Sequence, residues 1–98
     1  MLRITVLNDD FRTTRFKLEG KLAHEWVSEA KETWNALPRS GVTEQLVVDL
    51  LGVSFVDDRG KELLAEMHRA GAELVGAGPL ISQLIAEIKE FQALREGA

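Results

Sequence analysis

The chain has 98 residues, 45% of them hydrophobic, and its 16 acidic and 12 basic residues give a net charge of −4. This length fits one domain, since domains commonly hold roughly 100–200 residues, and the hydrophobic content excludes disorder of the whole chain. Nucleic-acid binders usually display a basic patch, whereas the basic residues here are scattered among acids, so we expect no nucleic-acid partner.

The sequence contains no cysteine, which excludes thiolate metal sites and cysteine nucleophiles and indicates a reducing compartment. Residues 1–10 show no cationic leader followed by a long apolar run, so no signal peptide is expected. No stretch approaches the ~20 apolar residues of a membrane span. We therefore predict a cytoplasmic protein with no direct membrane insertion.

The first half of the chain predicts a hairpin followed by a helix. Apolar and polar residues alternate over 2–7 and again over 13–19, which is typical of half-buried strands, and the polar residues 8–10 predict a turn between them. Gly20 is expected to end the second strand. Over 22–37 the apolar residues fall three and four apart, which predicts an amphipathic helix that the loop at 38–41 stops.

The second half predicts two further strand–helix units. The nearly continuous apolar run at 45–51, which includes the β-branched pair Val47 and Val48, indicates a strand covered on both faces, which Gly52 is expected to interrupt before a short apolar run at 53–56. A helix capped by Asp57 and Asp58 follows, with a stripe formed by Leu63, Leu64, Met67 and Ala70. Residues 72–75 predict a strand, and Pro79 opens a last helix with apolar residues at 81, 84, 85 and 88.

The predicted fold class is α/β, with the order β-β-α-β-α-β-α in one domain. Strands separated by helices imply parallel pairing through right-handed crossovers, and the opening hairpin adds an antiparallel pair, so a mixed sheet with packed helices is expected. We place the domain at residues 1–88. Residues 89–98 are expected to extend the last helix or to form a tail that contacts a partner.

Residues 46–60 carry a more specific signal. Seven of them match, in register, an apolar strand followed by Asp-Leu-x-Gly-Val-x-Phe, an apolar residue, Asp, two small residues and Gly: these are Asp49, Leu50, Gly52, Val53, Phe55, Asp57 and Gly60. This segment resembles the central signature of STAS domains, the family of anti-sigma-factor antagonists and of the cytoplasmic tails of some anion transporters. The resemblance runs from about Thr14 to Ile85, and Gly20 with Leu22 and Gly78 with Pro79 also fit it.

The resemblance implies a binding module and no catalytic activity. Family members often dock on a serine-kinase anti-sigma factor through the loop before the second helix and the first turns of that helix. Carried onto this sequence, the implied partner-binding residues are Asp57, Asp58, Arg59, Gly60, Lys61 and Leu64, joined by Gly20, Lys21 and His24. No cofactor or metal is implied, and an oligomer is compatible with the resemblance.

The sequence departs from the family at the phosphorylation position. In many members the residue before the equivalent of Gly60 is a serine that the kinase phosphorylates, whereas Arg59 stands here and has no hydroxyl. The nearest hydroxyl, Ser54, lies in an apolar run and is expected to be buried, facing a neighbouring element. No phosphorylation is therefore expected. Asp58 would present a fixed charge and Arg59 a rigid donor fork, although both aspartates also suit simple helix capping.

Three alternatives remain. A phosphoaspartate receiver is disfavoured because residues 13–19 predict a strand where a receiver needs a helix. A small enzyme is disfavoured because His24-Glu25 begins like a zinc protease motif but Ser28 stands where the second ligand belongs. Trp26 and Trp34, eight apart, fit the apolar stripe better than a ligand-stacking pair. Within the family, a STAS subunit of a lipid-transport ATPase complex is the alternative to a sigma-regulatory partner.

Overall fold

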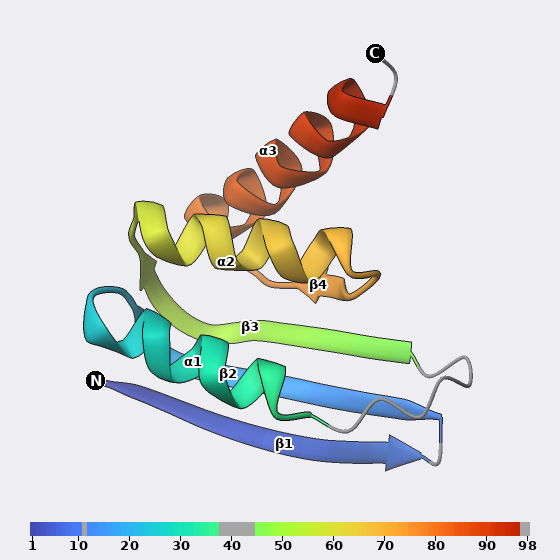
Figure 1. Ribbon diagram of the computed structural model, residues 1–98. Helices are drawn as coiled ribbons and strands as arrows, with labels where there is room; N and C mark the ends of the chain where they lie inside the picture. The colour runs from blue at the N-terminus through green and yellow to red at the C-terminus, as the bar shows by residue number, and fades with distance from the viewer. Residues whose placement is uncertain (11, 38–44, 97–98) are drawn as a thin grey trace.

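A computed structural model describes residues 1–10, 12–37 and 45–96 of the chain (Figure 1). Its elements follow the order β-β-α-β-α-β-α, which confirms the predicted fold class. They are β1 (Leu2–Asp10), β2 (Thr13–Leu22), α1 (Glu25–Asn35), β3 (Gln45–Val56), α2 (Asp58–Arg69), β4 (Glu73–Val75) and α3 (Pro79–Glu96). α3 thus runs on past residue 88 to Glu96.

The four strands form one mixed sheet in the order β1-β2-β3-β4. β1 pairs antiparallel with β2, with Val6 opposite Phe16. β2 pairs parallel with β3, and β3 pairs parallel with β4. In each case the intervening helix, α1 or α2, carries the chain back to the end of the sheet where the preceding strand began. The predicted N-terminal hairpin and mixed sheet are confirmed.

The strands are longer than the sequence indicated. The predicted turn at 8–10 is wrong, because β1 continues to Asp10 opposite Thr13, with an irregularity in register after Asn8. Gly20 does not end β2, which runs to Leu22, and α1 consequently begins at Glu25 instead of residue 22. In each case the neighbouring strand supplies backbone hydrogen bonds that outweigh the local turn preference.

Gly52 does not interrupt β3, which is one strand of 12 residues. The register moves from Lys17 opposite Asp49 to Glu19 opposite Gly52, so β3 carries one extra residue there as a bulge. The amide of Leu51 donates to Asp49 Oδ1 at 2.9 Å. A side chain thereby supplies an acceptor at the irregularity, and the strand passes through it unbroken.

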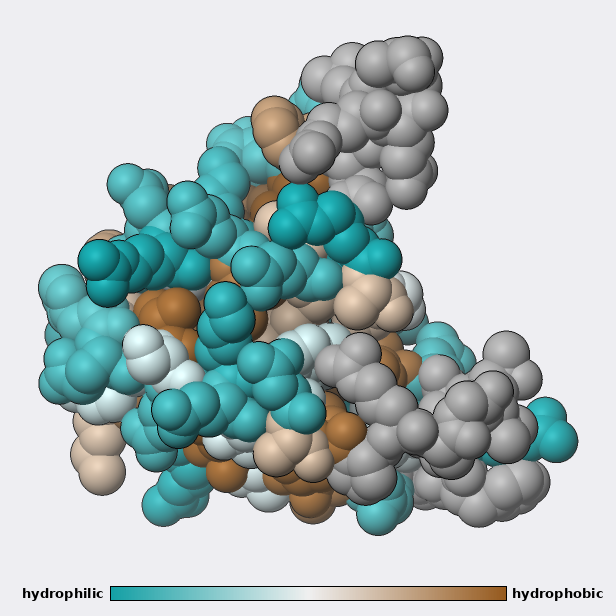
Figure 2. Space-filling model, viewed as in Figure 1, coloured by the Kyte–Doolittle hydropathy of each residue, from teal (hydrophilic) through white to brown (hydrophobic). Residues whose placement is uncertain are grey.

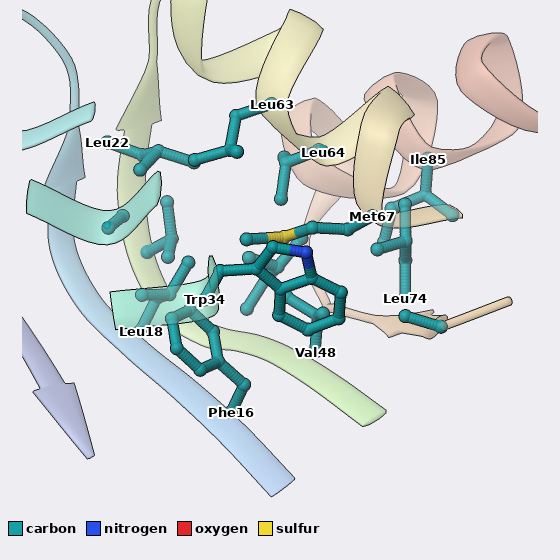
Figure 3. Packing of buried hydrophobic residues seen from close by; sticks show 14 of the residues in the cluster. Phe16, Leu18, Leu22, Trp34, Val48, Leu63, Leu64, Met67, Leu74 and Ile85 are labelled. Carbon is teal, nitrogen blue, oxygen red and sulfur yellow. The ribbon is translucent and has the colours of Figure 1, made fainter. Parts of the chain in front are cut away.

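The core lies between the sheet and the helices. Phe16 and Leu18 of β2 and Val48 and Leu50 of β3 face buried residues of α1, α2 and α3 in a single cluster (Figure 3). Trp34 is only 4% exposed and meets Phe16 edge to face, with ring centroids 5.6 Å apart. Trp26 is partly buried against the same cluster, so both tryptophans contact the core. Ala70, which was placed in the α2 stripe, is instead exposed at the C-cap.

Asp49 lies between two core residues and therefore points to the opposite face of the sheet. It is 5% exposed, and its Oδ2 accepts from Arg15 Nη1 at 3.1 Å. Removing one partner of a buried ion pair is costly, because the other charge is left without compensation. Arg15 and the Leu51 amide therefore account for the presence of a carboxylate in the middle of the sheet.

In the part of the chain that the structure describes, no helix is long and apolar enough to cross a membrane.

Candidate functional site

Asp57 joins the end of β3 to two other elements. It is the N-cap of α2, and its Oδ1 accepts from the Gly60 amide at 2.8 Å. Its Oδ2 accepts from the His24 amide at 2.9 Å, and its own amide donates to the Leu22 carbonyl at 3.1 Å. The expected capping role is confirmed for Asp57 but not for Asp58, which is the first residue of α2. The Asp57 carboxylate also fixes the turn between β2 and α1.

These contacts lower the pKa of Asp57 below its usual value of 3.8. The main cause is the hydrogen bond from the His24 backbone, followed by the one from the Gly60 backbone, with smaller electrostatic contributions from His24 and Arg59. Each of these interactions favours the ionised carboxylate. The negative charge of Asp57 is therefore stabilised by hydrogen bonds within the protein.

Gly60 and Gly20 each allow another backbone segment to approach closely, because neither residue has a Cβ. Gly60 is buried, and a Cβ there would collide with the Leu22 carbonyl and approach Val56 Cγ1 to 2.9 Å. Gly20 has φ +104°, and a Cβ there would collide with the Met1 carbonyl. In this structure the two glycines shape the site, and neither offers a side chain to a partner.

Leu64 does not lie on a free surface as the sequence suggested, and Lys61 is partly exposed but forms an ion pair. Leu64 is fully buried beneath α2, so its side chain cannot contact a partner directly. Lys61 Nζ pairs with Glu87 Oε2 of α3 at 2.8 Å. The apolar spacing of α2 placed Leu64 in the helical stripe, and the stripe faces the core.

Asp58, Arg59, Lys21 and His24 are exposed. The side chains of Asp58 and Arg59 form no hydrogen bond or ion pair with any residue that the structure describes. The β2–α1 turn and the start of α2 lie together at one end of the molecule, on the left in Figure 1. The structure therefore brings these four residues to the same end.

Sequence reasoning missed Phe55 as a surface residue. It is 50% exposed and lies opposite Lys21 in the pairing of β2 with β3. Its place in an apolar run suggested burial, and only its position two residues before Asp57 pointed toward the site. We call Lys21, His24, Phe55, Asp58 and Arg59 the docking surface.

The expectation that Ser54 is buried is wrong. Ser54 is exposed near the end of β3, and its hydroxyl donates to the Gly20 carbonyl at 3.3 Å. It does face the neighbouring strand, as expected, but it lies at a second irregularity in register, between the pairs Gly20–Val53 and Lys21–Phe55, and β4 does not reach this part of β3.

His24 has an unusual backbone conformation, with φ 53° and ψ −135°. The Trp26 amide donates to the Ala23 carbonyl at 3.1 Å, which closes a four-residue turn with His24 at its second position. These angles are near those of a type II′ turn, where glycine is preferred. Backbone strain of this kind costs of order 1–3 kcal/mol.

Replacing His24 by glycine is expected to stabilise the protein by about 1 kcal/mol, because relief of strain exceeds the added entropy of the unfolded chain. Urea denaturation measures the change. Glu25→Gly is the control: it lies in the first turn of α1 and should destabilise. A His24→Gly protein less stable than the natural one would show that the turn is not strained.

In the described ranges, no three His, Asp or Glu side chains gather as metal ligands would.

No family profile and no curated protein matches the sequence, but solved structures do. The anti-sigma-factor antagonist SpoIIAA in its unphosphorylated form is similar with a TM-score of 0.67 and 18% identity, over 95% of this chain and 98% of that one. An antisigma-factor antagonist STAS domain from Rhodobacter sphaeroides is similar with a TM-score of 0.53 and 22% identity, over 79% of this chain and 86% of that one. A structure of Mglu is similar with a TM-score of 0.58 and 22% identity. The match covers 76% of this chain but only 19% of the Mglu chain.

These similarities extend over most of the chain and agree with the strand order and helix placement described above. They confirm at the level of the fold the resemblance carried by residues 46–60. The chain therefore has the fold of a STAS domain.

Proposed function

We propose that this domain regulates a partner protein by binding it through the docking surface, and that it is not an enzyme. The observation that carries the proposal is the exposed start of α2, where Asp58 and Arg59 form no ion pair within the described residues. SpoIIAA, which has the same fold, is an anti-sigma-factor antagonist. The proposed partner is accordingly a kinase-like anti-sigma factor in the cytoplasm, and no cofactor is required.

The docking surface has the composition of a small interface. Aromatic residues and arginine contribute most of the binding energy in many interfaces, and Phe55 and Arg59 supply one of each. The Arg59 guanidinium offers a planar fork of donors that suits a partner carboxylate. Asp57 and Gly60 serve as positioning residues, because they hold the start of α2 against the β2–α1 turn.

We further propose that docking is constitutive. Arg59 occupies the position where the STAS resemblance implies a phosphorylated serine, so a serine kinase finds no hydroxyl there to phosphorylate. Asp58 carries one negative charge where a phosphoserine carries nearly two, and the adjacent Arg59 offsets it. The domain would therefore remain in a binding-competent state.

Arg59→Glu is expected to weaken partner binding about tenfold, because it replaces a donor fork by a like charge opposite a carboxylate. The partner is first captured on the immobilised domain and identified by mass spectrometry, and its affinity is then measured by calorimetry. Lys89→Glu, an equal charge reversal at an exposed position of α3, is the control and should bind normally. Equal affinities of the Arg59→Glu and natural proteins, with melting temperatures unchanged, would place the interface elsewhere.

Incubation with the captured kinase and labelled ATP tests constitutive docking. No label should enter the natural protein, while Arg59→Ser should become an acceptor. Label on Ser54 of the natural protein, which is exposed, would contradict the proposal.

A further inference from the structure

A second surface lies between α2 and α3. A groove of about 600 Å³ lies between the two helices, and its lining includes Glu62, Ala65 and Arg69 of α2 and Ile88, Glu90 and Phe91 of α3. In Figure 1, α3 starts beside α2 and then leans away from it toward the C-terminus. The groove is only partly enclosed and lies between two helices, so it suits a ligand lying along the surface better than a small enclosed one.

The groove has an apolar floor. Ala65 and Ile88 contribute small and aliphatic surface, and Phe91 leaves 59% of its surface exposed. Phe91 follows Ile88 by three residues, which places both on the same side of α3. Figure 2 shows apolar surface emerging along α3 among hydrophilic side chains.

The rim of the groove is acidic. Asp58, Glu62, Glu87 and Glu90 stand against Lys61 and Arg69. The Lys61 charge is already matched by Glu87, at 2.8 Å. Three carboxylates are therefore left against one guanidinium, and they repel anionic ligands, including nucleic acid and anionic lipid surfaces.

We propose that the groove between α2 and α3 binds a cationic amphipathic helix of a partner protein. Helices commonly bind in grooves by laying apolar residues into the floor, and basic residues flanking that apolar face would meet Glu62 and Glu90 on opposite walls. The charge complementarity selects a basic segment over an acidic or neutral one. This site does not depend on the docking surface, although Asp58 borders both.

A synthetic helix of about 14 residues, with leucines on one face and lysines on the other, serves as the probe. Its binding to the intact protein is followed by fluorescence anisotropy at low salt. The double variant Glu62→Lys with Glu90→Lys should weaken binding about tenfold, and 0.5 M salt should reduce the affinity of the natural protein by a similar factor. Phe91→Ser should also weaken binding, because it removes apolar surface from the floor.

Matched controls separate the groove from general attraction to an acidic protein. Glu29→Lys with Glu32→Lys makes the same charge change on exposed residues of α1 and should bind as the natural protein does. A scrambled peptide of identical composition should bind weakly. Equal losses in the two double variants, or equal binding of the scrambled peptide, would overturn the proposal. Arg59→Glu adds negative charge next to Asp58 and should not weaken peptide binding, so failure of the docking surface and failure of the groove are distinguishable.

Discussion

Replacement of Trp34 by alanine is expected to lower the free energy of unfolding by about 3–5 kcal/mol. The indole is 4% exposed and packs edge to face on Phe16, which is itself 1% exposed. Truncation removes buried aromatic surface and leaves a cavity between α1 and β2 that the surrounding backbone cannot fill. Urea denaturation followed by far-ultraviolet circular dichroism measures the loss.

Trp26→Ala is the matched control for Trp34. The two tryptophans lie on the same helix, but Trp26 is only partly buried, so its truncation should cost about 1–2 kcal/mol. If the two substitutions cost the same, the packing of α1 on the sheet would differ from that described here. If Trp26→Ala weakened partner binding without changing stability, that ring would instead have a binding role.

Asp57→Ala is expected to lower the melting temperature by roughly 10 °C at neutral pH. It removes the N-cap of α2 and, at the same time, the acceptor of the His24 amide. Two elements thus lose an anchor through one substitution. Asp58→Ala is the control, because Asp58 is exposed and caps nothing, and it should shift the melting temperature by no more than a few degrees.

The effect of Asp57→Ala should depend on pH. Because the pKa of Asp57 is lowered in the folded protein, its stabilisation is fully present above the unfolded value near 3.8 and is lost as the pH falls through the folded value. The melting temperatures of the natural and Asp57→Ala proteins should therefore differ most at neutral pH and converge in acid. A difference that stays constant down to about pH 2 would show that the carboxylate charge does not contribute.

The position of Asp57 links stability with the proposed binding function. Its carboxylate holds the start of α2 next to the β2–α1 turn, and the docking surface is built from those two segments. Loss of this link is expected to separate His24 from Arg59 as well as to destabilise the domain. Binding by Asp57→Ala should accordingly be weaker than its residual folded fraction explains.

The order of elements and most of the core followed from the sequence alone. Alternation at residues 2–7 and 13–19 and the three-and-four spacing of α1, α2 and α3 reflect which side chains leave water, and this periodicity is local. Asp57 was identified as a helix cap because capping needs only a short acceptor before the first turn. The STAS resemblance in residues 46–60 rested on the same kind of local pattern.

What the tertiary structure alone decided depends on contacts between distant residues. β3 passes Gly52 because the Asp49 carboxylate accepts from Leu51 and β2 continues alongside. Phe55 and Ser54 are exposed where the pairing of β3 with β2 shifts in register and β4 no longer lies alongside, whereas Leu64 is buried because the apolar side of α2 faces the core. The acidic groove requires residues more than twenty positions apart, such as Glu62 and Glu90, and no local pattern encodes the distance between them.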